Sequence, residues 1–453
     1  MKKILFIILS IALFTACERK IDEFQVSKGN ADFTRIVSIG NSMMAGIEDA
    51  ALYNSAQKNS IANLIAGQMQ LAGGGTFVQP VVKSEYGVEF PGSRPRMVLG
   101  YSTDCNGVVS LAPVPYIGTR DPLAPVGYQV NNLAIPGAKT AHLFAPGYGY
   151  PAYLVPPVRA NPYYFRFCSE PTNPTFKVVD EFAKLNPSFF VSWLGDNDVL
   201  SYALSGGAGD TITSPTSFQQ AMGGVLQYLK LSGAKGGVIA NIPDITAIPY
   251  FTTVPYNGIV LTRQSLVDSI NFFMDSLYKL PFVYKLGPNP FLVADPSSPH
   301  PVFKVRMMKP DELVLLTVPQ DSLKCFGMGI ISRLTYAPWG IPTQYVLTED
   351  EIANIKTATA AYNQIIQGLA TTFKIGVVDM NAKFMELQKG IIWDGVKMNS
   401  NFITGGAFSL DGVHLNQRGC ALAANYFIEA INRQYGSTIP YLDITKYPGV
   451  IFP

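Results

Sequence analysis

Two stretches of the chain hold residue types that could together carry out nucleophilic catalysis. Ser42 follows a short β-branched run, residues 35–39, that stops at Gly40. A serine on such a strand-to-helix turn can present its hydroxyl above the end of a sheet, although Ser, Gly and Asn are also ordinary turn residues. The chain has 3 histidines, and His414 follows Asp411 at a spacing that lets a carboxylate orient an imidazole. Ser42, His414 and Asp411 are therefore candidates for serine chemistry.

Such a reaction also needs hydrogen-bond donors for the oxyanion that forms on the substrate. The backbone N–H groups of Ser42 and Gly137 and the side-chain amide of Asn197 are available at turns that follow apolar segments. Each has a plainer interpretation, since Gly137 could be a turn glycine after Pro136 and Asn197 could cap a helix. These three groups are the candidate oxyanion hole.

Short apolar segments alternate with helical patterns over most of the chain. Strands are expected at residues 35–40, 129–134, 189–194, 236–241 and 375–379. Helical spacing is found at residues 59–71, 176–185, 218–231, 349–373 and 416–435. This alternation predicts a parallel sheet covered by helices on both faces, with sites at the carboxyl ends of its strands. Ser42, Gly137, Asn197 and Asp244 all follow expected strands, so we expect their turns to converge.

Two long stretches interrupt the alternation, near residues 73–130 and 245–347. The first is rich in Gly, Pro and Tyr, and the second combines a helical pattern with a Pro-rich loop. We interpret residues 35–436 as a single domain with two insertions, followed by a C-terminal tail at residues 437–453.

The N-terminus has the pattern of an export signal. Two lysines precede an apolar run at residues 4–14, and Thr15-Ala16-Cys17 follows. This resembles the lipobox of bacterial lipoproteins, which implies cleavage after residue 16 and lipid on the sulfur of Cys17. A plain signal peptide with an incidental cysteine is the alternative. Residues 17–34 would form a tether, and we expect a lipid-anchored protein of the bacterial cell envelope, periplasmic or on the cell surface, with the outer membrane preferred.

Charge and cysteine content restrict the partners. Removal of the signal takes away two of the 34 basic residues and none of the 32 acidic ones, which leaves no net charge and no attraction for nucleic acid. Four cysteines remain beyond Cys17, and none has metal-site spacing. We expect Cys105 to pair with Cys168 if any pair forms, and Cys420 to be a buried free thiol, with Cys325 unassigned.

The candidate residues carry a resemblance to a known family. Gly40-Asn41-Ser42-Met43, Gly137, Gly195-Asp196-Asn197-Asp198 and Asp411-Gly412-Val413-His414 follow, in order, the four blocks of the SGNH, or GDSL-type, hydrolase superfamily. With residues 132–138, the layout is similar to large GDSL-type lipoproteins of Bacteroidetes-like bacteria. The resemblance implies a flavodoxin-like three-layer α/β/α sandwich with a five-stranded parallel sheet.

The same resemblance implies roles for the site residues. Ser42 would be the nucleophile, His414 the general base and then acid, and Asp411 the group that orients His414. The backbone N–H groups of Ser42 and Gly137 and the Asn197 amide would bind the oxyanion. The reaction would be ester hydrolysis through an acyl-enzyme, with no metal and no cofactor, and Asp198 would support the Asn197 loop.

The chain departs from the family pattern beside the serine. Asn41 stands where the family usually has aspartate, which removes a charge near the turn. Met43 replaces leucine, and Leu415 stands where proline often follows the histidine. We expect the change at Asn41 to tune activity rather than abolish it.

These observations favour an exported, lipid-anchored serine esterase. The substrate would be a small-molecule, lipid or acetylated-glycan ester, and the sequence leaves its identity and the oligomeric state open. The alternative is a catalytically retired surface lipoprotein whose aromatic insertions bind glycan or lipid.

Overall fold

A four-stranded parallel sheet forms the centre of the computed structural model, which describes residues 24–453. Its strands are β1 (Ile36–Gly40), β8 (Phe189–Trp193), β9 (Gly236–Ala240) and β18 (Gly376–Val378), in that spatial order. In register, Gly40 pairs with Trp193 across β1 and β8. All residues of β1, β8 and β9 are buried, as expected for strands covered on both faces.

The expected strand at residues 129–134 is the exception, so the prediction of five strands is wrong for the described chain. This segment runs beside the free edge of β1 but forms one bridge, between Ser38 and Asn132. The N–H of Leu133 donates to the Ser38 carbonyl at 2.8 Å, and the N–H of Ile135 donates to the Gly40 carbonyl at 2.8 Å. The Asn132 side chain holds the segment in place: its amide donates to the Met44 carbonyl at 3.0 Å and its Oδ1 accepts the N–H of Ala134 at 3.1 Å.

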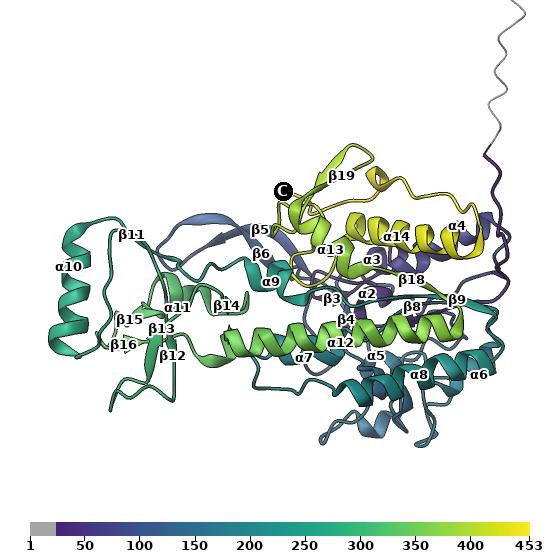
Figure 1. Ribbon diagram of the computed structural model, residues 1–453, viewed down its shortest axis with the longest axis horizontal. Helices are drawn as coiled ribbons and strands as arrows, with labels where there is room; N and C mark the ends of the chain where they lie inside the picture. The colour runs from purple at the N-terminus through teal and green to yellow at the C-terminus, as the bar shows by residue number, and fades with distance from the viewer. Residues whose placement is uncertain (1–23) are drawn as a thin grey trace, which may run out of the picture.

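Helices cover both faces of the sheet, which gives the expected three layers (Figure 1). On one face lie α4 (Ile61–Leu71) and α14 (Gln417–Tyr435), which contact each other. On the other lie α6 (Asp180–Leu185), α8 (Pro215–Leu231) and α12 (Glu349–Phe373). Each overlaps a segment with predicted helical spacing. Thr348 and Glu351 form a capping box at the start of α12, and Gly436 ends α14 in the left-handed conformation.

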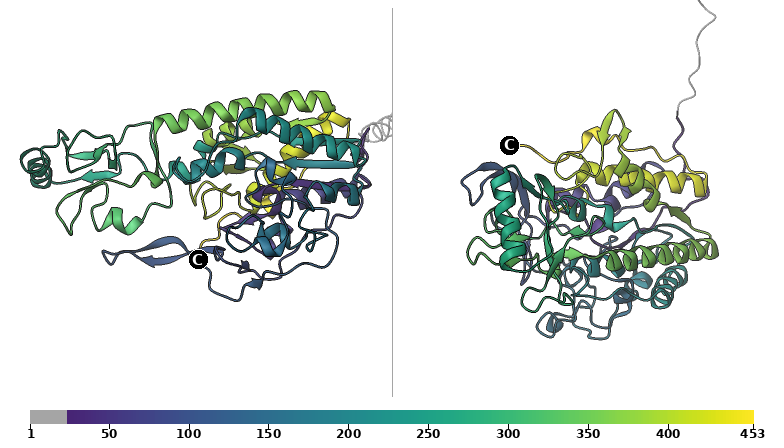
Figure 2. Two further views of the ribbon diagram at one scale, coloured as in Figure 1. Left: turned by 90° about the horizontal axis from the view of Figure 1, so that it is seen from below. Right: turned by 60° about the vertical axis from the view of Figure 1, so that its left-hand side comes forward.

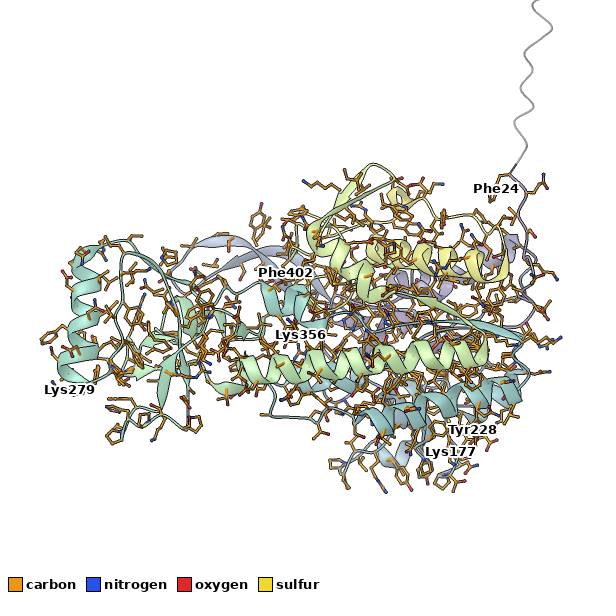
Figure 3. The ribbon with its side chains drawn as sticks, viewed as in Figure 1. Phe24, Lys177, Tyr228, Lys279, Lys356 and Phe402 are labelled. Carbon is orange, nitrogen blue, oxygen red and sulfur yellow. A yellow bond between two sulfur atoms is a disulfide. The ribbon has the colours of Figure 1, made fainter. Side chains whose placement is uncertain are left out.

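Residues 254–346 build a lobe that projects from the layered part of the molecule (Figures 1 and 2). It contains helices α10 (Gln264–Phe272) and α11 (Gln320–Lys324). Its two-stranded pieces include β10 (Ile259–Leu261) with β11 (Gly287–Asn289), and β12 (Leu292–Ala294) with β13 (Val305–Met307). Two apolar clusters within the lobe are separate from the main core. Figure 3 places Lys279 of this lobe and Phe24 at opposite ends of the molecule.

A long hairpin from the first of the two interrupting stretches is linked to the lobe by a disulfide. It consists of β5 (Met97–Thr103) and β6 (Val109–Pro115), and Cys105 in its turn forms a disulfide with Cys325 of the lobe. The predicted Cys105–Cys168 pair is therefore wrong. Cys168 is a buried free thiol that packs closely against Gly149, where a Cβ would lie 2.7 Å from the Cys168 side chain. Cys105, in contrast, is exposed at the tip of the hairpin. Cys420 is free and buried, as predicted.

The N-terminal signal, Cys17 and the first part of the expected tether, residues 17–23, lie outside the described residues. Within residues 24–453, no helix is long and apolar enough to cross a membrane.

Candidate active site

The turn after β1 fixes the position of Ser42. Ser42 is the first residue of the short helix α2 (Ser42–Ala45), and the Asn41 side chain caps it by accepting the N–H of Met43 at 3.0 Å. A Cβ at Gly40 would lie 2.6 Å from the Trp193 carbonyl oxygen, so β1 and β8 can approach this closely only with glycine there. The helix ends at Gly46 with φ of 87°. The Ser42 backbone is thus held on both sides.

The structure brings Ser42, His414 and Asp411 together, although 372 positions separate the serine from the histidine. His414 Nε2 lies 2.8 Å from Ser42 Oγ. His414 Nδ1 lies 2.8 Å from Asp411 Oδ2. This is the order of contacts that a nucleophile, a general base and an orienting carboxylate require.

Asp411 is held by backbone donors as well as by the imidazole. Its Oδ1 accepts the N–H groups of Val413 and His414, each at 2.8 Å, and its Oδ2 accepts the N–H of Ala50 at 2.9 Å. Burial acts to raise the pKa of Asp411, but the charge and hydrogen bond of His414 and these backbone N–H groups outweigh it and hold the pKa well below its ordinary value. The carboxylate therefore stays ionised and accepts from Nδ1.

The Ala50 contact comes from a turn that the sequence did not single out. Asp49 and Ala50 join β2 (Ile47–Glu48) to β3 (Ala51–Leu52), with φ of 52° and 68°. Non-glycine residues rarely adopt this left-handed conformation. Asp49 Oδ1 accepts the N–H of Leu410 at 3.0 Å, so the turn bonds to the Asp411 loop through both Asp49 and Ala50. Asp-Ala carries no hairpin-turn signal, which usually needs glycine.

A buried acidic pair backs this turn. The Tyr53 hydroxyl donates to Glu48 Oε2 at 2.6 Å and to Asp49 Oδ2 at 3.1 Å. The Arg96 guanidinium stacks 3.8 Å from the Tyr53 ring centroid, and its Nε lies 3.6 Å from Asp49 Oδ2. Burial raises the pKa of both Glu48 and Asp49, and the neighbouring Asp49 charge raises the pKa of Glu48 further. The Arg96 guanidinium thus lies beside the buried acids Glu48 and Asp49, and Asp49 in turn bonds to the loop that carries Asp411.

The candidate oxyanion donors lie at neighbouring turns. The Ile135–Gly40 hydrogen bond draws residues 135–137 alongside the Ser42 turn. Gly137 has φ of 77°, and a Cβ there would meet nothing within 4 Å, so this backbone borders open space. Among the described residues, neither the Ser42 nor the Gly137 N–H has a protein acceptor. The Asn197 amide donates to the Ala138 carbonyl at 3.1 Å and keeps a second N–H.

Asp196 and Asp198, on either side of Asn197, hold the surrounding turns. Asp196 is buried and accepts Trp193 Nε1–H at 3.2 Å and the Asn41 side-chain amide. Its burial raises its pKa to about 7. Asp198 Oδ2 accepts the N–H and hydroxyl of Thr140 at 2.8 and 2.7 Å, which ties the loop after Gly137 to α7 (Asn197–Leu204). Both carboxylates thus accept hydrogen bonds that hold the turns around the candidate site.

The other histidines have partners elsewhere. His142 Nδ1 accepts the N–H of Lys139 at 3.1 Å, and His300 Nε2 lies 2.9 Å from the Tyr278 carbonyl in the lobe. Within residues 24–453, no group of His, Cys, Asp and Glu is arranged to hold a metal ion.

Comparisons with known proteins give distant structural likenesses. No family model and no curated protein matches the chain. Similar solved structures include a putative GDSL-like lipase from Parabacteroides merdae, with 10% identity, a TM-score of 0.34, and coverage of 90% of this chain and 99% of that one. An acetyl xylan esterase from Geobacillus stearothermophilus has 11% identity, a TM-score of 0.34, and coverage of 92% and 100%. With identities and TM-scores this low, the likeness by itself assigns neither an activity nor a substrate to this chain.

Proposed function

We propose that this protein is a serine hydrolase that cleaves carboxylic esters through an acyl-enzyme. The observation that carries the proposal is the pair of 2.8 Å contacts that links Ser42 Oγ to His414 and His414 to Asp411. An ionised Asp411 favours the tautomer with the proton on Nδ1, which leaves the Nε2 lone pair facing the serine hydroxyl.

In the first step, Ser42 Oγ attacks the ester carbonyl carbon while His414 Nε2 takes the hydroxyl proton. Negative charge develops on the carbonyl oxygen, and the N–H groups of Ser42, Gly137 and Asn197 would stabilise it. His414 then returns the proton to the leaving alcohol as the ester C–O bond breaks. In the second step, His414 Nε2 takes a proton from water while the water oxygen attacks the acyl carbonyl carbon. The bond between that carbon and Ser42 Oγ then breaks, His414 returns the proton to Oγ, and the carboxylic acid leaves.

We also propose that the mature protein is attached to a membrane of the cell envelope through lipid on Cys17. The support is the lipobox-like sequence. The tether would join the molecule near Phe24, so the lobe, which contains Lys279, would lie at the end farthest from the membrane attachment. Cys17→Ala should move the protein from the membrane to the soluble fraction of cells, and retention in the membrane would contradict this part of the proposal.

The catalytic proposal is tested with Ser42→Ala and His414→Ala on p-nitrophenyl acetate and butyrate. Each variant should lose about three orders of magnitude or more in kcat while remaining folded. Ser276→Ala is the matched control, because Ser276 lies in an Asp-Ser-Leu sequence of the lobe, far along the chain from the Ser42 turn, and should keep full activity. Full activity in Ser42→Ala would refute the assignment.

A further inference from the structure

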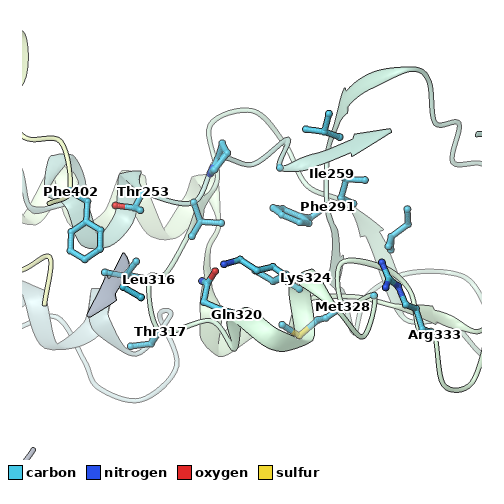
Figure 4. A pocket seen from close by; sticks show the side chains of 18 of the residues that line it. Thr253, Ile259, Phe291, Leu316, Thr317, Gln320, Lys324, Met328, Arg333 and Phe402 are labelled. Carbon is cyan, nitrogen blue, oxygen red and sulfur yellow. The ribbon is translucent and has the colours of Figure 1, made fainter. Parts of the chain in front are cut away.

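A cavity of about 1240 Å³ lies between the lobe, the β5–β6 hairpin and the loop that carries Asp411. Sites for drug-sized molecules usually occupy about 300–1,000 Å³, so this space exceeds what a small acyl group such as acetyl needs. Figure 4 shows side chains from several separate segments around it. The cavity is therefore built mainly by the two stretches that interrupt the α/β alternation.

One end of the cavity reaches the catalytic loop. Leu410 and Asp411 belong to its wall. The N–H of Tyr250 donates to the Gly412 carbonyl at 2.9 Å, and a Cβ at Gly412 would lie 3.0 Å from the Leu316 side chain. Tyr250 and Leu316 also line the cavity. The space thus begins beside the loop that presents His414 to Ser42, and Asp411 itself is part of its wall.

The wall is mostly apolar along its length. Figure 4 shows Phe402 and Leu316 toward one end, and Phe291, Ile259 and Met328 toward the other. Four long polar residues also border the space, and all four are exposed to solvent, so a bound chain need not remove their polar ends from water: Gln320 and Lys324 of α11, Arg94 and Arg333. A long apolar space that starts at a catalytic loop is suited to an extended hydrocarbon chain.

We propose that this cavity binds the acyl chain of the ester substrate, so that the preferred substrates are esters of medium- and long-chain fatty acids. The inference rests on the proposed function of Ser42. The chain would lie in the cavity while its carboxyl carbon is at Ser42 Oγ. It stays there when the bond to the leaving alcohol breaks and the bond to Oγ forms, and it departs as the free fatty acid after water attacks.

The Cys105–Cys325 disulfide is part of the same proposal. It fixes the hairpin, which supplies Met97, Leu111 and Ala112 to the wall, onto the lobe next to Lys324. The two walls come from segments with a sequence separation of 220 residues, and the disulfide is the covalent link between them. We expect it to maintain the width of the cavity and hence the preference for long chains.

The test is a series of p-nitrophenyl esters from acetate to decanoate, assayed below the concentration at which they aggregate. Burial of one methylene contributes about 0.8 kcal/mol, so kcat/KM should rise about fourfold per added methylene over the first several. Hydrolysis of acetate with no rise, or with a fall, at longer chains would overturn the cavity proposal and leave the esterase proposal standing. Absence of hydrolysis at every length would overturn both.

Two variants locate the effect. Ala112→Trp places a large ring in the cavity and should lower kcat/KM for decanoate by tenfold or more while acetate changes less than twofold. Val109→Trp, three residues away on β6 and therefore on the opposite face of the strand, is exposed and outside the wall; it is the matched control and should leave both unchanged. Cys105→Ser with Cys325→Ser should flatten the chain-length profile without loss of acetate hydrolysis. An unchanged profile in both Ala112→Trp and the double cysteine variant would overturn the proposal.

Discussion

Replacement of Asn41 by aspartate should weaken the fold at the Ser42 turn in a pH-dependent way. Asn41 is 2% exposed and Asp196 is 6% exposed, and the Asn41 amide donates to Asp196 Oδ2. Asn41→Asp removes this donor and puts a second carboxyl against Asp196. The other contact of Asn41, the cap on the N–H of Met43, needs only an acceptor and would survive.

The size of the effect follows from the loss of a hydrogen bond to a buried charged group, which costs about 1.5–3 kcal/mol. Burial already raises the pKa of Asp196 to about 7, and a neighbouring carboxyl raises it further. A group whose pKa is higher in the folded than in the unfolded state contributes stability that is present at low pH and lost as the pH rises through the folded value. At about pH 5 the two carboxyls of the variant can share a proton and keep a hydrogen bond, so the deficit should be smaller there than at about pH 8.

Urea unfolding of wild type and Asn41→Asp at both pH values measures this difference. Asn401→Asp, which adds the same charge at an exposed position, is the matched control and should change stability by less than about 0.5 kcal/mol. Hydrolysis of short esters should change by less than about tenfold, because the cap that orients Ser42 remains. Equal stability of variant and wild type at pH 8, or a larger deficit at pH 5 than at pH 8, would refute this reasoning.

Three further predictions concern the groups around the site. Asp411→Asn should lower kcat on short esters by about 10⁴, because the introduced amide disfavours the tautomer of His414 that can act as a base, and a normal rate would contradict this. Ala50→Gly should keep the N–H that bonds to Asp411, leave activity unchanged, and stabilise the protein against urea by up to about 1 kcal/mol, since glycine adopts φ of 68° without strain; destabilisation would count against the turn geometry. Cys168 and Cys420 should react with a maleimide only after denaturation, and rapid reaction of either in the native protein would contradict its burial.

The residues of the candidate site could be predicted from the sequence because each lies in a recognisable local pattern. Ser42 follows a buried strand that ends at glycine, and Asp411 and His414 are three residues apart on one loop. Parallel strands bring such turns to one edge of a sheet regardless of the length of chain between them. Asn197 follows β8 at this edge, whereas Gly137 follows a segment that runs beside β1 through the Ile135–Gly40 hydrogen bond. The Asn197 amide joins the two turns by donating to the Ala138 carbonyl.

The parts that could not be predicted depend on contacts between distant segments. Nothing in the local sequence indicates that the N–H of Ala50 bonds to Asp411, because its left-handed turn contains no glycine. The Cys105–Cys325 disulfide depends on how the hairpin lies against the lobe, which spacing alone does not determine. Residues 129–134 have the composition of a strand, but their pairing with β1 is a single bridge, between Ser38 and Asn132, and no local pattern predicts how short it is.

Labelling with a fluorophosphonate, followed by intact-mass and peptide measurements, tests the central claim most directly. The reagent forms a stable bond to a serine only when a neighbouring base activates its hydroxyl. The account predicts one adduct per chain, located on Ser42, that is absent in Ser42→Ala and strongly slowed in His414→Ala. No adduct on the folded wild-type protein, or an adduct that persists in Ser42→Ala, would contradict it.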